Sequence, residues 1–164
     1  MAIGVFPGSF DPLTTAHLAV AEAAIDACDL DRLDLVVSTV ALAKEAGAHS
    51  SVEDRIATID RLVDVMPQLR AKVTTHQLLA DIAEGYDVLV LGADKWHQLH
   101  DVSFYGSASE RDAALARLPL VAVAPRAEVE IPPAGRGLVI LDVAPALHAV
   151  SSTAVRSGRE EWRA

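Results

Sequence analysis

The sequence is poor in cysteine and in aromatic residues: its 164 residues include a single cysteine, Cys28, and 4% Phe, Trp and Tyr. A lone cysteine cannot form a disulfide within the chain, and no Cys/His spacing is typical of a zinc site. No run of about 18 apolar residues occurs, so we expect no membrane-spanning helix. The first residues also lack the basic segment of a secretory signal. These absences predict a cytoplasmic protein with no membrane partner and no metal held by its own side chains.

Basic residues are also scarce, because the chain has 14 Lys and Arg but 23 Asp and Glu, a net charge of −9. This balance argues against a nucleic-acid partner, since phosphate backbones are bound by basic surfaces. A nucleotide can still bind where a few cations and backbone donors meet. The candidate cations are Lys44, Arg55, Arg126 and Arg156, and the alternative for each is a solvated surface charge.

Hydrophobic residues make up 51% of the chain, in apolar segments that alternate with segments of helical pattern. We predict strands at 2–6, 33–39, 71–75, 88–91, 120–124 and 138–141. We predict helices at 15–28, 52–66, 76–84, 109–117 and 152–159. Continuous apolar strands between helices indicate an α/β fold, a doubly wound parallel sheet covered on both faces. We expect one domain over residues 1–164, with its ligand beyond the carboxyl ends of the strands.

Residues 7–17 read Pro-Gly-Ser-Phe-Asp-Pro-Leu-Thr-Thr-Ala-His and lie between the first predicted strand and the first predicted helix. The backbone N–H groups of such a turn and the positive end of the helix suit an anion. Gly8 allows a phosphate or another backbone segment to approach closely. Thr14 and His17 are three residues apart, so one helical turn brings them to the same face. We predict a phosphate-binding junction, with an ordinary strand-to-helix loop as the alternative.

Residues 150–156, Val-Ser-Ser-Thr-Ala-Val-Arg, open the last predicted helix. A Ser or Thr there caps the helix and leaves N–H donors in its first turn, which can hold a phosphate together with the hydroxyls. Arg156 adds a positive charge one turn further along. A plain helix cap is the alternative interpretation.

These two strings resemble the two signatures of the HIGH-type nucleotidyltransferase superfamily, in the same order. The first looks most like that of pantetheine-phosphate adenylyltransferase, in which Thr takes the place of the first His, although Ala16 stands where Gly is usual. The segment Gly92-Ala93-Asp94 resembles the Gly-x-Asp segment of nicotinate and nicotinamide mononucleotide adenylyltransferases. It departs from the Gly-Leu-Arg of pantetheine-phosphate adenylyltransferase, whose Arg serves ATP.

The resemblance implies a Rossmann-like nucleotidyltransferase that transfers AMP from ATP to a phosphorylated small molecule, with Mg²⁺ bound mainly through the phosphates. It implies catalytic roles for His17, which would donate to the α-phosphate, for Thr14, and for Lys44, which would neutralise the acceptor phosphate. The implied nucleotide- and phosphate-binding residues are Gly8, Ser9, Phe10, Asp94, Ser151, Ser152, Thr153 and Arg156. Because the pantetheine enzymes are hexamers, a homo-oligomer is a further expectation.

Asp94 is expected to avoid the triphosphate, because two like charges about 4 Å apart repel by roughly 4 kcal/mol at an effective dielectric constant near 20. A ribose hydroxyl, a base amine or a Mg²⁺-bound water would suit its carboxylate better. A residue that merely ends the strand is the alternative.

Three functions stay open at this point. Adenylyl transfer to 4′-phosphopantetheine is favoured by residues 7–17, by Lys44 and by the length of the chain. Transfer to a pyridine mononucleotide is favoured by residues 92–96. A nucleotide-binding protein with little catalysis is suggested by Ala16 and by the missing Arg, and a cytidylyltransferase is a further alternative.

Overall fold

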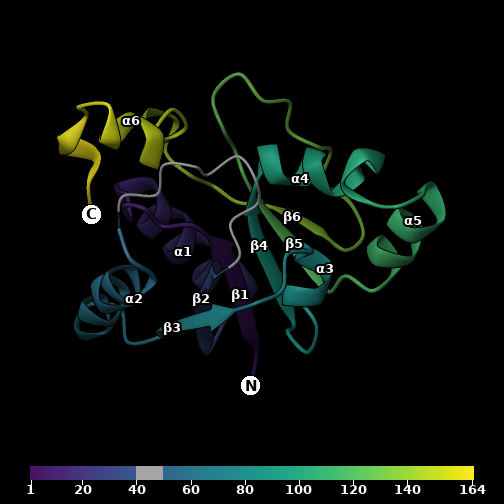
Figure 1. Cartoon of the computed structure of the whole chain (residues 1–164), viewed down its shortest axis with the longest axis horizontal. Coiled ribbons are helices and arrows are strands. Elements are labelled where there is room, and N and C mark those ends of the chain that lie inside the picture. The colour runs from purple at the N-terminus through teal and green to yellow at the C-terminus, as the bar shows by residue number, and fades with distance from the viewer. Residues whose placement is uncertain (40–49) are drawn as a thin grey trace.

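Residues 1–39 and 50–164 are described by a computed structural model, so the predicted role of Lys44 lies outside the described residues. Within them, six strands pair in parallel in the order β3-β2-β1-β4-β5-β6 (Figure 1). The strands are β1 (Ile3–Gly8), β2 (Arg32–Ser38), β3 (Leu69–Thr74), β4 (Val88–Gly92), β5 (Leu120–Ala124) and β6 (Leu138–Ile140).

The helices are α1 (Thr15–Cys28), α2 (Val52–Asp60), α3 (Leu79–Ile82), α4 (Ala93–His100), α5 (Ala108–Ala116) and α6 (Ser152–Arg156). Short 3-10 turns cover Arg61–Asp64, Val102–Phe104, Pro145–Leu147 and Glu160–Trp162. No helix of residues 1–39 and 50–164 is long and apolar enough to cross a bilayer.

Two apolar cores lie on the two faces of the sheet, because successive side chains of each strand point to opposite sides. On one face, strand residues such as Phe6, Leu35 and Val90 pack with the apolar sides of α1 and α2. On the other face, residues such as Val5 and Leu89 pack with α3, α4 and α5. The sheet is therefore covered on both sides, which confirms the predicted doubly wound α/β fold.

The strand order reverses direction at the pair β1 and β4, which is the switch point of the sheet. The chain leaves β1 toward α1 on one face and leaves β4 into α4 on the other (Figure 1). Ligands of such sheets bind in the crevice outside the strand ends at this point. The segments 9–17 and 93–97, both singled out by the sequence, start from this crevice.

Several predicted helices are shorter in the structure. The segment 52–66 tightens into a 3-10 turn after Asp60, ahead of Pro67, which disfavours helix in the residue before it. The segment 76–84 is reduced to α3, because the N–H of His76 bonds the side chain of Thr74 at 3.1 Å. The last helix ends at Arg156, before Gly158, whose φ of 121° no right-handed helix allows.

Helix α4 is not anticipated by the sequence analysis, which treats residues 92–96 as the end of a strand. Gly92 has extended backbone and is the residue before the first helical turn, so β4 passes into α4 without a loop. The apolar spacing Ala93, Trp96 and Leu99 is a helical signal, and Ala93 and Leu99 are buried.

Asp34 carries a buried charge in the middle of β2. Its carboxylate is fully buried, lies 2.9 Å from both Arg32 and Lys72, and accepts a hydrogen bond of 2.8 Å from the Tyr86 hydroxyl. Burial and this hydrogen bond raise the pKa of the Tyr86 phenol. The cluster ties β2, β3 and the segment before β4 together.

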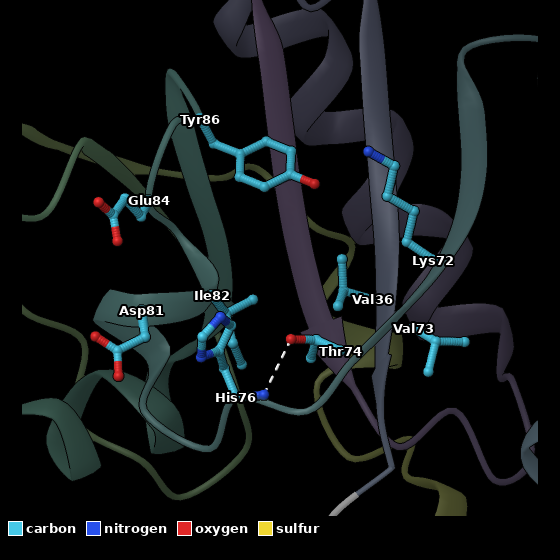
Figure 2. Close-up of a pocket in the computed structure, with 9 residues that line it drawn as sticks. All are labelled: Val36, Lys72, Val73, Thr74, His76, Asp81, Ile82, Glu84 and Tyr86. Carbon is cyan, nitrogen blue, oxygen red and sulfur yellow. Dashed lines mark hydrogen bonds between the residues drawn. The ribbon is translucent and has the colours of Figure 1, made fainter.

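A cavity of about 310 Å³ lies beside this cluster, over β2 and β3 and against α3. Figure 2 shows Lys72 and Tyr86 at one end of it and Thr74 and His76 at the other, joined by their hydrogen bond. This cavity lies over the face of the sheet at strands β2 and β3. It is therefore not at the switch point between β1 and β4. The switch-point crevice, in contrast, lies at the ends of β1 and β4.

Replacing Asp34 by Ala should lower the free energy of unfolding by about 1–3 kcal/mol, because Tyr86 loses its acceptor while Arg32 and Lys72 can turn to water. Urea unfolding followed by circular dichroism measures this change. Tyr86→Phe, which removes only one hydrogen bond, should cost about 1 kcal/mol. An Asp34→Ala protein as stable as the unaltered one would show that the cluster is not stabilising.

Candidate active site

Thr14 and His17 form the start of α1 as a reciprocal cap. The Thr14 side chain accepts from the backbone N–H of His17 at 3.3 Å, and the backbone N–H of Thr14 donates to Nδ1 of His17 at 2.9 Å. Such a pair satisfies two N–H groups that the helix itself leaves unbonded. The predicted proximity of the two side chains is present, and its immediate cause is helix capping.

This cap fixes the chemistry of His17. Because Nδ1 accepts a hydrogen bond from an N–H, the neutral ring carries its proton on Nε2, which is then a donor. Burial and, secondarily, the positive charge of Arg126 lower the pKa of His17 from its usual value near 6.5 to about 4. At neutral pH His17 is therefore a neutral hydrogen-bond donor at the switch point.

Two aromatic rings pack around His17. The rings of Phe6 and Phe10 meet edge-on at 5.4 Å, and Phe10 lies 5.0 Å from the imidazole. Phe10 is buried although its φ of 48° is left-handed, a conformation that costs a non-glycine residue about 1–2 kcal/mol. Its ring takes the space in front of Gly8, where a Cβ would lie only 2.8 Å away. Glycine is thus required at position 8 by the Phe10 ring, and not only by the approach of a phosphate or another backbone segment.

The carbonyl groups of the loop between β1 and α1 accept hydrogen bonds from other segments of the chain. Arg55 of α2 donates to the Ser9 carbonyl at 2.9 Å. The remaining donors come from the other end of the chain: Arg156 donates to the carbonyl of Asp11, the Ser152 hydroxyl to that of Pro12 at 2.7 Å, and the N–H of Ala164 to that of Leu13 at 3.0 Å. Residues 9–13 therefore depend on contacts up to about 150 positions away.

The second motif begins α6 next to this loop. Ser151 caps the helix, since its side chain accepts from the N–H of Ala154 at 3.0 Å. Arg156 also donates to the Thr153 hydroxyl at 3.2 Å, and Thr153 is exposed. The structure thus brings the two motifs together as predicted. It also gives Ser151, Ser152 and Arg156 bonds within the protein.

Asp94 lies in the first turn of α4 and is exposed. It lines a cavity of about 390 Å³ with Arg126 and Glu128, which follow β5, and with His148, which precedes α6. The cavity therefore joins the ends of β4 and β5 to the segment that leads into the second motif. Among the described residues, no group of three or more His, Cys, Asp or Glu is placed to hold a metal ion.

The sequence profile of the cytidylyltransferase-like family matches residues 5–158. The chain belongs to this family. The match covers both motifs and the sheet between them, so the family likeness expected from the two motifs is confirmed.

Curated relatives within the family divide between two activities. A probable nicotinate-nucleotide adenylyltransferase of Agrobacterium fabrum is 39% identical over 77 residues, which cover 47% of this chain and 40% of the relative. A phosphopantetheine adenylyltransferase of Streptococcus suis is 34% identical over 86 residues, 52% of this chain and 50% of the relative. The chain thus matches about half the length of these relatives or less.

Among solved structures, the nicotinic acid mononucleotide adenylyltransferase of Plasmodium falciparum complexed with NaAD superimposes with a TM-score of 0.68 and 14% identity. The superposition covers 95% of this chain and 82% of that chain. At this identity the likeness concerns the fold of the family, which both chains share.

Three hydrogen bonds around the candidate site could not be predicted from the sequence. Arg55 and Arg126 are candidate cations there, but their partners, the carbonyls of Ser9 and Val150, are backbone groups that carry no residue signature. The Ala164 contact to Leu13 is likewise a backbone bond between distant segments. Side-chain patterns identify which residues matter, whereas these backbone partners appear only in the fold.

The imidazole of His17 should titrate with a midpoint near pH 4 in the folded protein, as measured by NMR of its ring carbons. In the urea-unfolded chain the midpoint should return to about 6.5. The unfolded chain then binds the proton first, so the stability contributed by neutral His17 should be lost as pH falls from about 6.5 to about 4. A folded-state midpoint near 6.5 would contradict the proposed burial of a neutral ring.

Arg156→Gln should remove the arginine donor to the Asp11 carbonyl and lower the free energy of unfolding by about 1 kcal/mol. It should also raise hydrogen exchange of the backbone amides in residues 10–14, measured by mass spectrometry. Arg159→Gln is the matched control, because this exposed arginine pairs with Glu161 rather than with the loop. Equal exchange in both variants would show that Arg156 does not hold the loop.

Proposed function

We propose that the chain is a nucleotidyltransferase that moves the AMP group of ATP to a phosphorylated small molecule and releases pyrophosphate. 4′-Phosphopantetheine is the favoured acceptor. The observation that carries the proposal is the capped His17, which presents a neutral N–H donor at the switch point of the sheet between the two family motifs.

In the proposed reaction, an oxygen of the acceptor phosphate attacks the α-phosphorus of ATP and forms a new P–O bond. The bond from the α-phosphorus to the bridging oxygen breaks, and pyrophosphate leaves with that electron pair. The attacking phosphate is already an anion at neutral pH, so no general base is required. Catalysis then consists of holding two phosphates in line and stabilising the charge that develops.

The residues have separate roles in this reaction. His17 Nε2 would donate to the α-phosphate, and the hydroxyl of Thr14 would assist it. Ser9 and the amide of Phe10 would hold the acceptor phosphate or the α-phosphate, while Lys44 would neutralise the acceptor phosphate. The first turn of α6, with Ser151, Ser152, Thr153 and Arg156, would adjoin the β- and γ-phosphates. Ser151, Ser152 and Arg156 already make hydrogen bonds within the protein. We therefore expect backbone N–H groups of α6 to make many of the hydrogen bonds to these phosphates.

Mg²⁺ fits this site as an ion carried by the substrate. Mg²⁺ keeps several waters and is bound by phosphates with one or two carboxylates, and the cavity offers Asp94 for such a contact. When bound, the ion would neutralise charge on the phosphates. Asp94 would face a Mg²⁺-bound water or a hydroxyl or amine of the nucleotide.

A pyridine mononucleotide is the second candidate acceptor. The Gly-x-Asp segment favours it, because Asp94 follows the switch-point strand directly and lies open in the cavity. The relatives support both acceptors, since they include a probable nicotinate-nucleotide adenylyltransferase and a phosphopantetheine adenylyltransferase.

A substrate panel tests the proposal. The purified chain is incubated with ATP or CTP and with 4′-phosphopantetheine, nicotinate mononucleotide or nicotinamide mononucleotide, and pyrophosphate release is measured. Release with ATP and 4′-phosphopantetheine is the expected result. Release with a mononucleotide moves the assignment to the second acceptor, and release with CTP alone changes the nucleotide. ATP binding without release in any combination would reject the enzymatic assignment.

His17→Ala should lower kcat by about 10²–10³, because it removes a donor to the transition state. His17→Gln should lose turnover as well while keeping the helix cap, since Gln is a usual partner in that position. Thermal unfolding of both variants separates the loss of the cap from the loss of the imidazole. Turnover that survives in His17→Ala would mean that the imidazole does not act on the phosphate.

A further inference from the structure

Arg126 lies two residues beyond β5, directly beside the end of β4. Residues Gly92 and Ala124 are paired in the sheet, and the chain continues through Pro125 to Arg126. The Cγ and Cδ atoms of Arg126 lie 3.6 Å from the position that a Cβ on Gly92 would occupy. The side chain of Arg126 therefore passes over the end of the switch-point strand.

The guanidinium of Arg126 is fixed in place toward the second motif. It donates to the carbonyl of Val150 at 2.9 Å, the residue just before the cap of α6. The neighbouring N–H of Ala127 donates to the carbonyl of His148 at 3.0 Å. Arg126 is half-buried, so its position is set by the fold rather than by solvent.

The charge of Arg126 also reaches the first motif, because it helps to lower the pKa of His17. Arg126 thus lies between the imidazole assigned to the α-phosphate and the helix assigned to the β- and γ-phosphates. Of the described residues that line the cavity beside it, Arg126 is the one Lys or Arg, while Asp94 and Glu128 are acidic. Without Arg126, an anion that enters this cavity would meet two carboxylates and no Lys or Arg among the described lining residues.

We propose that Arg126 is a further triphosphate-binding cation of this chain and contacts the phosphates around the oxygen that bridges the α- and β-phosphorus. In pantetheine-phosphate adenylyltransferase the Arg of the Gly-Leu-Arg segment would lie at the end of β4, where this chain has Asp94. Arg126 would supply the corresponding positive charge from the end of β5. The catalytic role of Arg126 rests on the proposed nucleotidyl transfer, whereas the binding of an anion by Arg126 does not. Charge develops on the leaving pyrophosphate as the bridging bond breaks, so Arg126 should act mainly on kcat.

Binding is tested with tripolyphosphate by isothermal titration calorimetry, since this probe needs no acceptor and no turnover. Arg126→Gln should weaken its affinity at least tenfold. Arg136→Gln, which removes an exposed arginine from the same β5–β6 connection, should leave the affinity unchanged. Equal affinity in Arg126→Gln and the unaltered protein, or no binding by the unaltered protein, would overturn the proposal.

Turnover with the acceptor found in the substrate panel gives the second measurement. Arg126→Gln should lower kcat by about 10² with a smaller change in KM, and Arg126→Lys should recover part of the loss because a charge is restored without the planar donor pair. A loss in KM alone, with kcat retained, would overturn the assignment to the bridging oxygen.

Two controls distinguish a role of Arg126 in binding from a purely structural role. The midpoint of His17 in NMR titration should rise in Arg126→Gln and stay unchanged in Arg136→Gln. Thermal unfolding should show Arg126→Gln to be folded. If tripolyphosphate binding depends on Arg126 but no acceptor yields pyrophosphate, the proposed function fails while the anion site stands; normal turnover in Arg126→Gln rejects the catalytic role of Arg126 alone.

Discussion

The carbonyl groups of residues 9–13 are the constraint on which the candidate site depends. A strand-to-helix junction could adopt many conformations, and an isolated loop would populate several of them. Here Arg55 binds one carbonyl, and Ser152, Arg156 and Ala164 bind three more. The loop is therefore ordered before any ligand arrives, so the entropy of ordering it need not be lost again when a phosphate binds.

The same arrangement explains why two short motifs at opposite ends of the chain belong together. Ser152 and Arg156 look like phosphate ligands in the sequence, but in the fold they also join the second motif to the first. A residue that bonds the neighbouring loop and also contacts the proposed phosphates would be under two separate constraints. Neutral His17 follows a similar logic, because the bond that caps the helix also decides which ring nitrogen carries the proton.

Strand positions, the parallel sheet and its doubly wound form could be predicted, because continuous apolar segments and strand–helix alternation are local patterns. The Thr14–His17 contact and the Ser151 cap can also be predicted, since each lies within one helical turn. Helix α4 was missed because it starts without a loop after β4. The cluster around Asp34 could not be foreseen, since Arg32, Lys72 and Tyr86 come from three separate segments.

The backbone pairing of residues 163 and 164 with Thr14 and Leu13 has a consequence for how the chain folds during synthesis. The first strand and helix emerge early from the ribosome, yet their connecting loop receives its last donors only when residues 151–164 have been made. The sheet can form beforehand from the six strands, which all precede residue 141. A nascent chain that lacks residues 151–164 would thus contain the six strands but only one of the four donors to this loop, that of Arg55.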